Sequence, residues 1–261
     1  MARIGQAVRR MAGAAAALGA MTLSGTAGAQ ITAGEWRGQI TPYVWATGVG
    51  GTLRPSAGTP TIRMQRSFSD LRKDADGGLF LSGLARRDRL VLLGDLSWSS
   101  SSRAGRLVAP APALPARGKL RQGSLTLAGG WRVLDTPDAA VDLLGGLRHW
   151  RMRGQVSAAP VPGVFPGGRV SASRSFTDPI IAARLNLRLA PAWSAIAYGD
   201  IGGFGVGSRS TAQVLGTVNY QAGAQLTLSA GYRHLVVDYR SGGSRFDVTM
   251  GGPILGATWQ F

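Results

Sequence analysis

Two histidines and one serine-rich stretch are the residues of this sequence that could support hydrolysis. His149 and His234 are the only histidines, and each directly follows an arginine. A serine nucleophile needs a base within hydrogen-bond reach, and serines alternate at Ser97, Ser99 and Ser101. Nothing in the sequence indicates that these serines lie within hydrogen-bond distance of His149. Hydrolysis of a lipid or of a peptide is therefore the alternative function, and a non-enzymatic role is favoured.

Other positions do not complete a catalytic or ligand-binding set. Asp238 follows His234 by four residues, and two residues of a strand already span about 7 Å, so a direct dyad cannot form. The sequence has no cysteine, which excludes a thiol nucleophile and a thiolate metal site. The glycines of 202–205 lack the helix and the Lys-Ser/Thr pair that follow a phosphate loop. We predict no catalytic residue, no metal and no cofactor.

Acidic residues and arginines recur on the polar face of segments in which apolar and polar residues alternate. If these segments close into a barrel, the charged side chains share a narrow interior, where buried charges need partners. We predict an ion-pair network made of Asp95, Asp142, Asp178, Asp200, Arg148, Arg184, Arg188 and Arg233. Two roles remain open for this network, a structural plug that keeps the barrel rigid or a charged path for a small solute.

The segments that carry these residues have the period of two that is typical of β-strands. At the C-terminus, for example, Leu255, Ala257, Trp259 and Phe261 lie on one face. Ten such segments follow one another, at 36–45, 79–86, 90–101, 122–132, 141–148, 178–189, 193–206, 213–220, 226–233 and 244–261. The sequence therefore predicts an all-β fold of about ten strands.

The connections between the segments alternate in length. Four are tight, at 86–89, 134–139, 190–192 and 222–224. Between them fall long connections at 49–78, 103–118 and 154–175, with shorter ones near 205–209 and 241–243. Short turns on one rim and long loops on the other are typical of an up-and-down outer-membrane barrel. An eleventh strand at 61–68 would break this alternation. We therefore interpret 52–68 as an extension of the first strand that folds back, and 69–73 as a short helix capped by Ser69 that could plug the mouth.

The first 29 residues have the pattern of a cleaved secretory signal peptide. Arg3, Arg9 and Arg10 precede an apolar stretch at 11–23, and Ala27-Gly28-Ala29 forms a small-residue cleavage site. The remaining residues, 30–261, suffice for one large all-β domain. They contain no apolar run of about 18 residues, so a membrane protein made from them must be a closed barrel.

Alternation alone does not decide which face of the strands points inward. A soluble barrel of the lipocalin type would fill its interior with the apolar face, whereas a membrane barrel turns that face to lipid. The signal peptide, the terminal aromatic residue and the unequal loops favour lipid. We therefore predict that the apolar face contacts acyl chains and the charged face lines the lumen.

The net charge of +16, from 29 basic and 13 acidic residues, would suit a nucleic-acid binder, but the predicted export argues against that partner. The expected long loops are rich in arginine, and guanidinium groups bind phosphate in a bidentate manner. We predict contact with the phosphates of lipopolysaccharide in the outer leaflet. The candidates are Arg103, Arg106, Arg117, Lys119, Arg121, Arg151 and Arg153.

Several motifs carry a resemblance to known proteins. They lie at 41–48, 67–71, 93–96, 178–181, 199–207 and 231–234, and the Gly-Asp-Ile-Gly-Gly-Phe-Gly block at 199–205 is the most specific. Together they resemble a widespread group of poorly characterised proteobacterial outer-membrane barrel proteins, although His234 departs from the aromatic residue typical there. The last strand also resembles the signal that such barrels present to their assembly machinery, through Trp259 and Phe261. The resemblance implies a fold and a location, the outer membrane, but no reaction.

Overall fold

The computed structural model describes residues 34–54, 62–66, 75–107, 114–160, 166–241 and 243–261. The chain divides into two compact units, Met1–Ala33 and Gly34–Phe261, and only the second is described below. The predicted signal peptide at 1–29 and the predicted helix at 69–73 lie outside the described residues. Within them, no helix is long and apolar enough to cross a membrane.

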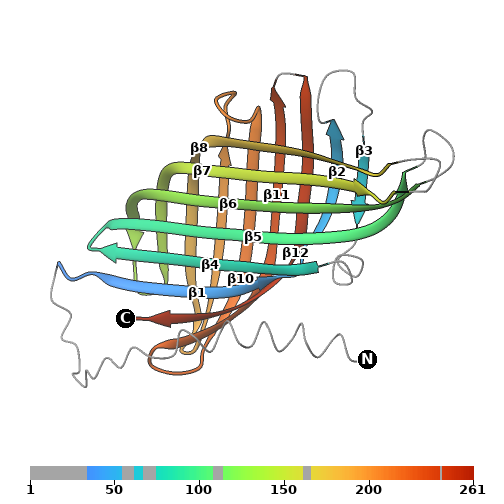
Figure 1. Cartoon of the computed structure of the whole chain (residues 1–261). Helices are drawn as coiled ribbons and strands as arrows, with labels where there is room; N and C mark the ends of the chain where they lie inside the picture. Colours follow the sequence, from blue (N-terminus) through green and yellow to red (C-terminus); the bar gives the residue numbers. More distant parts are fainter. Residues whose placement is uncertain (1–33, 55–61, 67–74, 108–113, 161–165, 242) are drawn as a thin grey trace. The chain divides into compact units, whose positions relative to one another are not determined.

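Ten antiparallel strands of the described chain close into a single up-and-down barrel, which confirms the predicted fold class (Figure 1). Each strand pairs with the next along the chain, and the first pairs with the last, Ile40 lying opposite Trp259. The barrel strands are β1 (Arg37–Trp45), β4 (Ala75–Arg87), β5 (Leu90–Leu107), β6 (Leu114–Asp135), β7 (Ala139–Ala158), β8 (Gly168–Ala190), β9 (Trp193–Gly202), β10 (Ser210–Gln221), β11 (Leu226–Ser241) and β12 (Ser244–Gln260).

Two further strands extend the first one, as the interpretation of 52–68 expects. β2 (Gly48–Arg54) continues along β12 beyond the end of β1, with Val49 opposite Met250. β3 (Ile62–Arg66) folds back antiparallel on β2. Neither strand inserts between neighbours of the ten-stranded barrel, so the even strand count is preserved.

The barrel has one rim of tight turns and one rim at which every connection except that between β11 and β12 is longer. Tight turns join β4 to β5, β6 to β7, β8 to β9 and β10 to β11, and we call this end the short-turn rim. At the long-loop rim, the expected loops 103–118 and 154–175 were wrong, because most of these residues are in strands. β5 pairs with β6 as far as Leu107 and Leu114, and β7 with β8 as far as Ala158 and Gly168. Apolar alternation ends before the strand does, because backbone pairing needs no apolar side chain.

β9 and β10 are short, with 10 and 12 residues, compared with 20 to 23 residues in β6, β7 and β8. β9 ends at Gly202 rather than at the expected residue 206, because the chain turns there. Gly203 and Gly205 adopt φ values of 86° and 78°. This left-handed region favours glycine. A Cβ atom on Gly203 would also lie 2.4 Å from the hydroxyl of Ser208. The turn therefore depends on glycine at this position.

The two faces of the strands point as predicted. Leu127, Leu147 and Leu255 lie on the outer wall, with 59%, 56% and 65% of their surface exposed. Asp142 and Arg148 lie inside, with at most 1% exposed. Charged groups fill the middle of the barrel and leucines cover its wall, which is the arrangement of a barrel that spans lipid rather than of a soluble one.

A single charged substitution tests this orientation. We expect Leu127→Arg to lower the free energy of unfolding in lipid vesicles by about 2–4 kcal/mol, because the guanidinium would be placed in hydrocarbon. Val133→Arg, on the outer face of the same strand next to the short-turn rim, is the control and should cost at most about 1 kcal/mol. Urea titration followed by tryptophan fluorescence measures both. Equal small effects would contradict a lipid-facing wall, since exposed sites of soluble proteins tolerate such changes.

Candidate functional site in the barrel lumen

The centre of the lumen holds a fully buried ion pair between Arg148 and Asp200. The guanidinium donates through Nη1 and Nη2 to the two carboxylate oxygens, at 2.9 and 2.6 Å. Its Nε donates to the hydroxyl of Thr126 at 2.9 Å, and Gln213 donates to Asp200 at 3.3 Å. The pair joins β7 to β9 across the intervening β8, and each nitrogen of the guanidinium and each oxygen of the carboxylate has a hydrogen-bond partner.

A second pair beside it joins β11 to β5. Arg233 donates through Nη2 to Asp95 at 3.0 Å and through Nη2 and Nε to the side-chain oxygen of Gln213, at 2.6 and 2.9 Å. It also donates to the hydroxyl of Tyr43, which in turn donates to Asp95 at 2.8 Å. Because Gln213 contacts both Asp200 and Arg233, the two ion pairs form one connected arrangement, which we call the charged layer.

A third group lies nearer the short-turn rim and includes an arginine that the sequence interpretation missed. Asp142 accepts from Arg132 Nε at 2.7 Å and from Arg184 Nη1 at 3.1 Å. Arg132 stands directly opposite Asp142 in the pairing of β6 with β7. Its position on the polar face was visible in the sequence, but the register that brings it to Asp142 was not.

Two residues of the predicted network are not in an ion pair within the described chain. Asp178 is fully buried and accepts from the backbone N–H of Ser208 at 2.6 Å and from Nε1 of Trp150 at 3.1 Å. It therefore anchors the turn between β9 and β10 instead of pairing with an arginine. Arg188 lies in the lumen near the short-turn rim, exposed and without an acidic partner among the described residues.

The long-loop side of the charged layer is filled by apolar and aromatic side chains, which the sequence interpretation did not foresee. Phe176 of β8 stacks on Tyr239 of β11 with ring centroids 4.3 Å apart, and on Trp150 at 6.1 Å. β8 and β11 come together here because β9 and β10, which separate them nearer the short-turn rim, end before this level. Leu235, Val237, Val248, Met250, Trp45 and Ile254 complete this cluster, which we call the aromatic layer.

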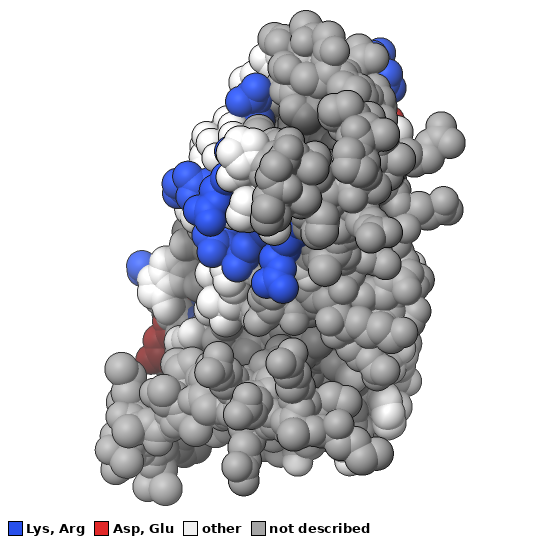
Figure 2. All heavy atoms as spheres, turned by 45° about the vertical axis from the view of Figure 1, so that its right-hand side comes forward, with Lys and Arg blue, Asp and Glu red and all other residues white. Residues whose placement is uncertain are grey.

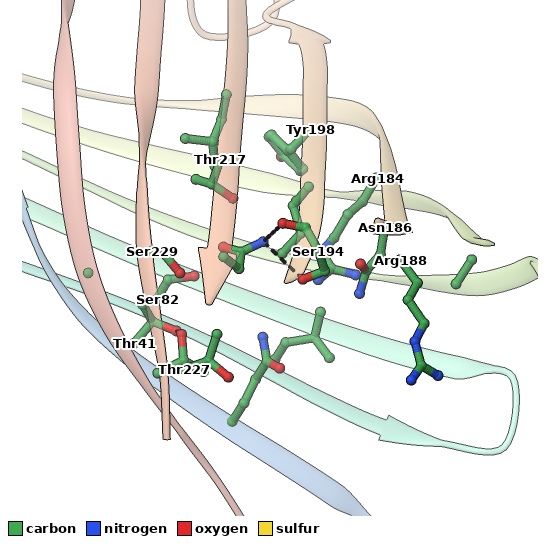
Figure 3. Close-up of a pocket in the computed structure, with 18 of the residues that line it drawn as sticks. Thr41, Ser82, Arg184, Asn186, Arg188, Ser194, Tyr198, Thr217, Thr227 and Ser229 are labelled. Carbon is green, nitrogen blue, oxygen red and sulfur yellow. Dashed lines mark hydrogen bonds between the residues drawn. The ribbon is translucent and has the colours of Figure 1, made fainter. Parts of the chain in front are cut away.

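The other side of the charged layer is hollow. A cavity of about 530 Å³, which we call the chamber, extends from Arg148 and Tyr198 to the turns that contain Pro137 and Pro191. Figure 3 shows its walls, with side chains of β8 on one side and hydroxyl groups of other strands across from them. The lumen thus consists of a hollow part, the charged layer and the aromatic layer, in that order from the short-turn rim.

The histidines and serines considered for hydrolysis are not brought together. His149 lies exposed on the outer wall, where Nδ1 is 2.9 Å from the hydroxyl of Thr177. His234 is also on the outer face, beside Gly251. Ser97 points into the lumen and contacts Tyr43, Asp95 and Arg233. Neither histidine is paired with a carboxylate in the described part of the chain.

The basic candidates for lipopolysaccharide contact lie on strands rather than in loops. Arg117, Lys119 and Arg121 alternate along β6, on the face that carries Leu125 and Leu127 nearer the middle of the barrel. Arg151 and Arg153 lie on the same outer face of β7, and Arg169 follows on β8. Figure 2 shows lysine and arginine side chains gathered at this end of the barrel. We call these six residues the basic wall. Arg103 and Arg106 belong to β5, but their side chains lie outside the described part.

The C-terminal residues take part in closing the barrel. The backbones of Gly38 and Phe261 exchange hydrogen bonds of 2.8 and 2.9 Å. The ring of Phe261 covers Gly38 so closely that a Cβ atom there would lie 2.3 Å from it. Trp259 and Phe261 both present exposed rings on the outer wall, 52% and 66% of their surface being accessible.

Known structures share the architecture but little sequence. The chain is similar to the outer membrane protease OmpT of Escherichia coli, with a TM-score of 0.57, 11% identity and coverage of 90% of this chain and 99% of that one. It also matches the translocator domain of the autotransporter NalP of Neisseria meningitidis (TM-score 0.48, 13% identity, 100% and 96% covered) and Ail of Yersinia pestis (0.35, 13%, 88% and 100%). No family model and no curated protein matches the sequence. The fold is therefore that of outer-membrane β-barrels, and the likeness extends no further.

Proposed function

We propose that this chain is a non-enzymatic outer-membrane barrel with a sealed interior, and that its role is structural. The observation that carries the proposal is the charged layer, in which Arg233 of β11 bonds to Asp95 of β5 across the lumen at 3.0 Å. Gln213 joins this contact to the buried pair of Arg148 and Asp200. The aromatic layer closes the lumen a second time, on the long-loop side of the charged layer. The leucine-rich outer wall and the predicted signal peptide support location in the outer membrane.

Opening the lumen would require both layers to separate. Breaking a buried ion pair costs several kcal/mol, because each group would be left without its partner in a medium of low dielectric constant. The stacked rings of Phe176 and Tyr239 would also have to part. A continuous aqueous path through the closed state would need both events at once, which favours the structural role over a solute channel.

Recording from planar bilayers tests the sealed interior. After reconstitution of the folded barrel we expect no ion conductance above the background of the protein-free bilayer. Small, defined conductance steps would favour the narrow channel for a small solute instead. Large, ungated steps would contradict the proposal, because an open pore is incompatible with either closure.

We propose lipopolysaccharide as the partner of the basic wall. Arg121 and Arg153 are directly opposite each other in the pairing of β6 with β7. Like charges in this position repel one another, and an anion bound between or above them would offset the repulsion. The basic wall begins next to Leu125, where the apolar outer face ends, and in the proposed orientation this part faces the phosphates of the outer leaflet. Trp259 and Phe261 are proposed in addition as the signal for the barrel-assembly machinery.

A paired substitution tests the lipopolysaccharide contact. We expect Arg121→Ala with Arg153→Ala to weaken lipopolysaccharide binding by roughly tenfold, as the loss of one or two charge-assisted hydrogen bonds implies. The control pair is Arg209→Ala with Arg240→Ala, two exposed arginines that contact Asp238 instead. The rise in thermal unfolding temperature on adding lipopolysaccharide measures the affinity of each variant. Equal rises for both pairs would refute a specific role for the basic wall.

A barrel enzyme acting on lipid A or on peptides is the second candidate. One observation favours the lipid-acting form, namely that His149 and the hydroxyl of Thr177 are within hydrogen-bond distance on the outer wall, next to the arginines of β7. No described carboxylate orients His149, which weakens the case. His149→Ala and His234→Ala should leave the lipid A profile of the cells and any peptide hydrolysis unchanged. Loss of hydrolysis in either variant would replace the non-enzymatic proposal.

A further inference from the structure

The chamber has two walls of different chemistry. One is formed by inward side chains of β8, Arg184, Asn186 and Arg188, which Figure 3 shows together on one side. Across the chamber lie the hydroxyl groups of β1, β4 and β11, among them those of Thr41 and Ser229. Hydroxyl and amide groups can both donate and accept, whereas a guanidinium only donates. A matching ligand therefore carries hydroxyl groups on one side and an anionic acceptor on the other.

The arginines on this side of the chamber differ in their partners, and two acidic residues, Asp135 and Asp138, line the chamber beside them. Arg132 and Arg184 share the single buried carboxylate of Asp142, and Arg132 also contacts Asp135. Arg188 has no acidic partner within the described chain, and its exposed side chain lines the chamber. This guanidinium is therefore available to an anion that enters from the short-turn rim.

At the inner end of the chamber, the hydroxyl of Tyr198 is buried and has no hydrogen-bond partner among the described residues. The carboxylate of Asp200 lies nearby and accepts three hydrogen bonds from Arg148 and Gln213, but none from this hydroxyl. Buried polar groups are nearly always hydrogen-bonded, so an unpaired hydroxyl on a residue that lines a cavity indicates a missing partner. This observation is independent of the charge of Arg188, and it points to a ligand in the same space.

We propose that the chamber binds a small, hydroxyl-rich anion about the size of a disaccharide, that is, a sugar that carries a carboxylate or a phosphate group. Its cavity of about 530 Å³ is in the range of small-molecule sites. Arg188 and Tyr198 are four positions apart in register across β8 and β9, roughly 13 Å along the strand. A disaccharide spans this distance, with its anionic group at Arg188 and its hydroxyl groups toward Tyr198. The site opens at the short-turn rim, on the side opposite to the aromatic layer.

Isothermal titration calorimetry on the folded full-length barrel in detergent tests the site. The probes are lactobionate, a disaccharide carboxylate, and trehalose 6-phosphate, with lactose and trehalose as their uncharged matches. We expect at least one anionic probe to bind about tenfold more tightly than its neutral match. Binding of only one of the two anions would identify the acidic group and support the proposal.

Two variants locate the binding within the chamber. Arg188→Ala and Tyr198→Phe should each weaken binding of that anionic probe about tenfold, because each removes one hydrogen-bonding group without filling the cavity. Arg209→Ala, which removes an exposed arginine at the long-loop rim, should have no effect. The proposal is overturned if neither anion binds, if neutral sugars bind equally well, or if Arg209→Ala weakens binding as much as Arg188→Ala. Migration of the unheated barrel on a gel verifies that each variant is folded.

Discussion

Replacement of Arg148 by methionine is expected to lower the free energy of unfolding by about 3–5 kcal/mol, the usual cost of removing one partner of a buried ion pair. The substitution leaves Asp200, which is 4% exposed, with Gln213 as its remaining donor in the lumen. It also leaves the hydroxyl of Thr126 without its contact to Nε. Urea unfolding in lipid vesicles, followed by tryptophan fluorescence, gives the change directly.

Two further variants separate the lost ion pair from other consequences of the substitution. Arg148→Met combined with Asp200→Leu should recover most of the lost stability, because no uncompensated charge remains buried. Arg188→Met, which alters a lumen arginine without an acidic partner in the described chain, should change stability by no more than about 0.5 kcal/mol. If Arg148→Met were as mild as Arg188→Met, the charged layer would not hold the barrel closed, and the sealed interior would lose its main support.

Truncation of Trp150 to alanine is the second substitution with a large expected effect, about 3–5 kcal/mol, since it leaves a cavity within the aromatic layer. The indole is 4% exposed, stacks on Phe176 and donates to Asp178 at 3.1 Å. Its loss would leave the buried Asp178 with the N–H of Ser208 as its remaining donor. The same urea titration measures the effect.

Trp98→Ala is the matched control for this truncation. Trp98 also lies on a long strand, β5, but on the outer wall, with 44% of its surface exposed. Its removal loses apolar contact but leaves no cavity, because lipid fills the space, so we expect about 1–2 kcal/mol. A larger loss for Trp98→Ala than for Trp150→Ala would mean that the aromatic layer does not pack as a core.

Local patterns in the sequence predicted the strands well and their ends poorly. The alternation at 122–132 identified the apolar and polar faces of β6, because a strand turns successive side chains to opposite faces. The same criterion missed Leu114 to Arg121, because basic residues stand there on the face that is apolar nearer the middle of β6. It also extended β9 past Gly202, since the turn there depends on φ values that hydrophobicity does not report.

The candidate site was predictable in its residues and not in its contacts. The sequence marked Arg148, Asp200, Arg233 and Asp95 as lumen residues because each lies on the polar face of an alternating segment. It did not distinguish Asp178 from the aspartates that pair with arginine, although Asp178 accepts its hydrogen bonds from the backbone of a turn and from an indole. Nor did it reveal that Phe176 and Tyr239, 63 positions apart in the chain, would stack.

The strand period of two is a local property of the chain, so the sequence separated an apolar face from a charged face. The signal-peptide pattern, the terminal aromatic residue and the unequal loops then predicted that the charged face lies inside. Which charges meet, and where the lumen is filled or hollow, depends on the three-dimensional fold. Arg148 reaches Asp200 across 52 residues of sequence, and that contact depends on the stagger of every strand between them. β9 and β10 are short, so β8 and β11 approach each other beyond their ends, toward the long-loop rim. The aromatic layer forms there, and the chamber lies toward the short-turn rim.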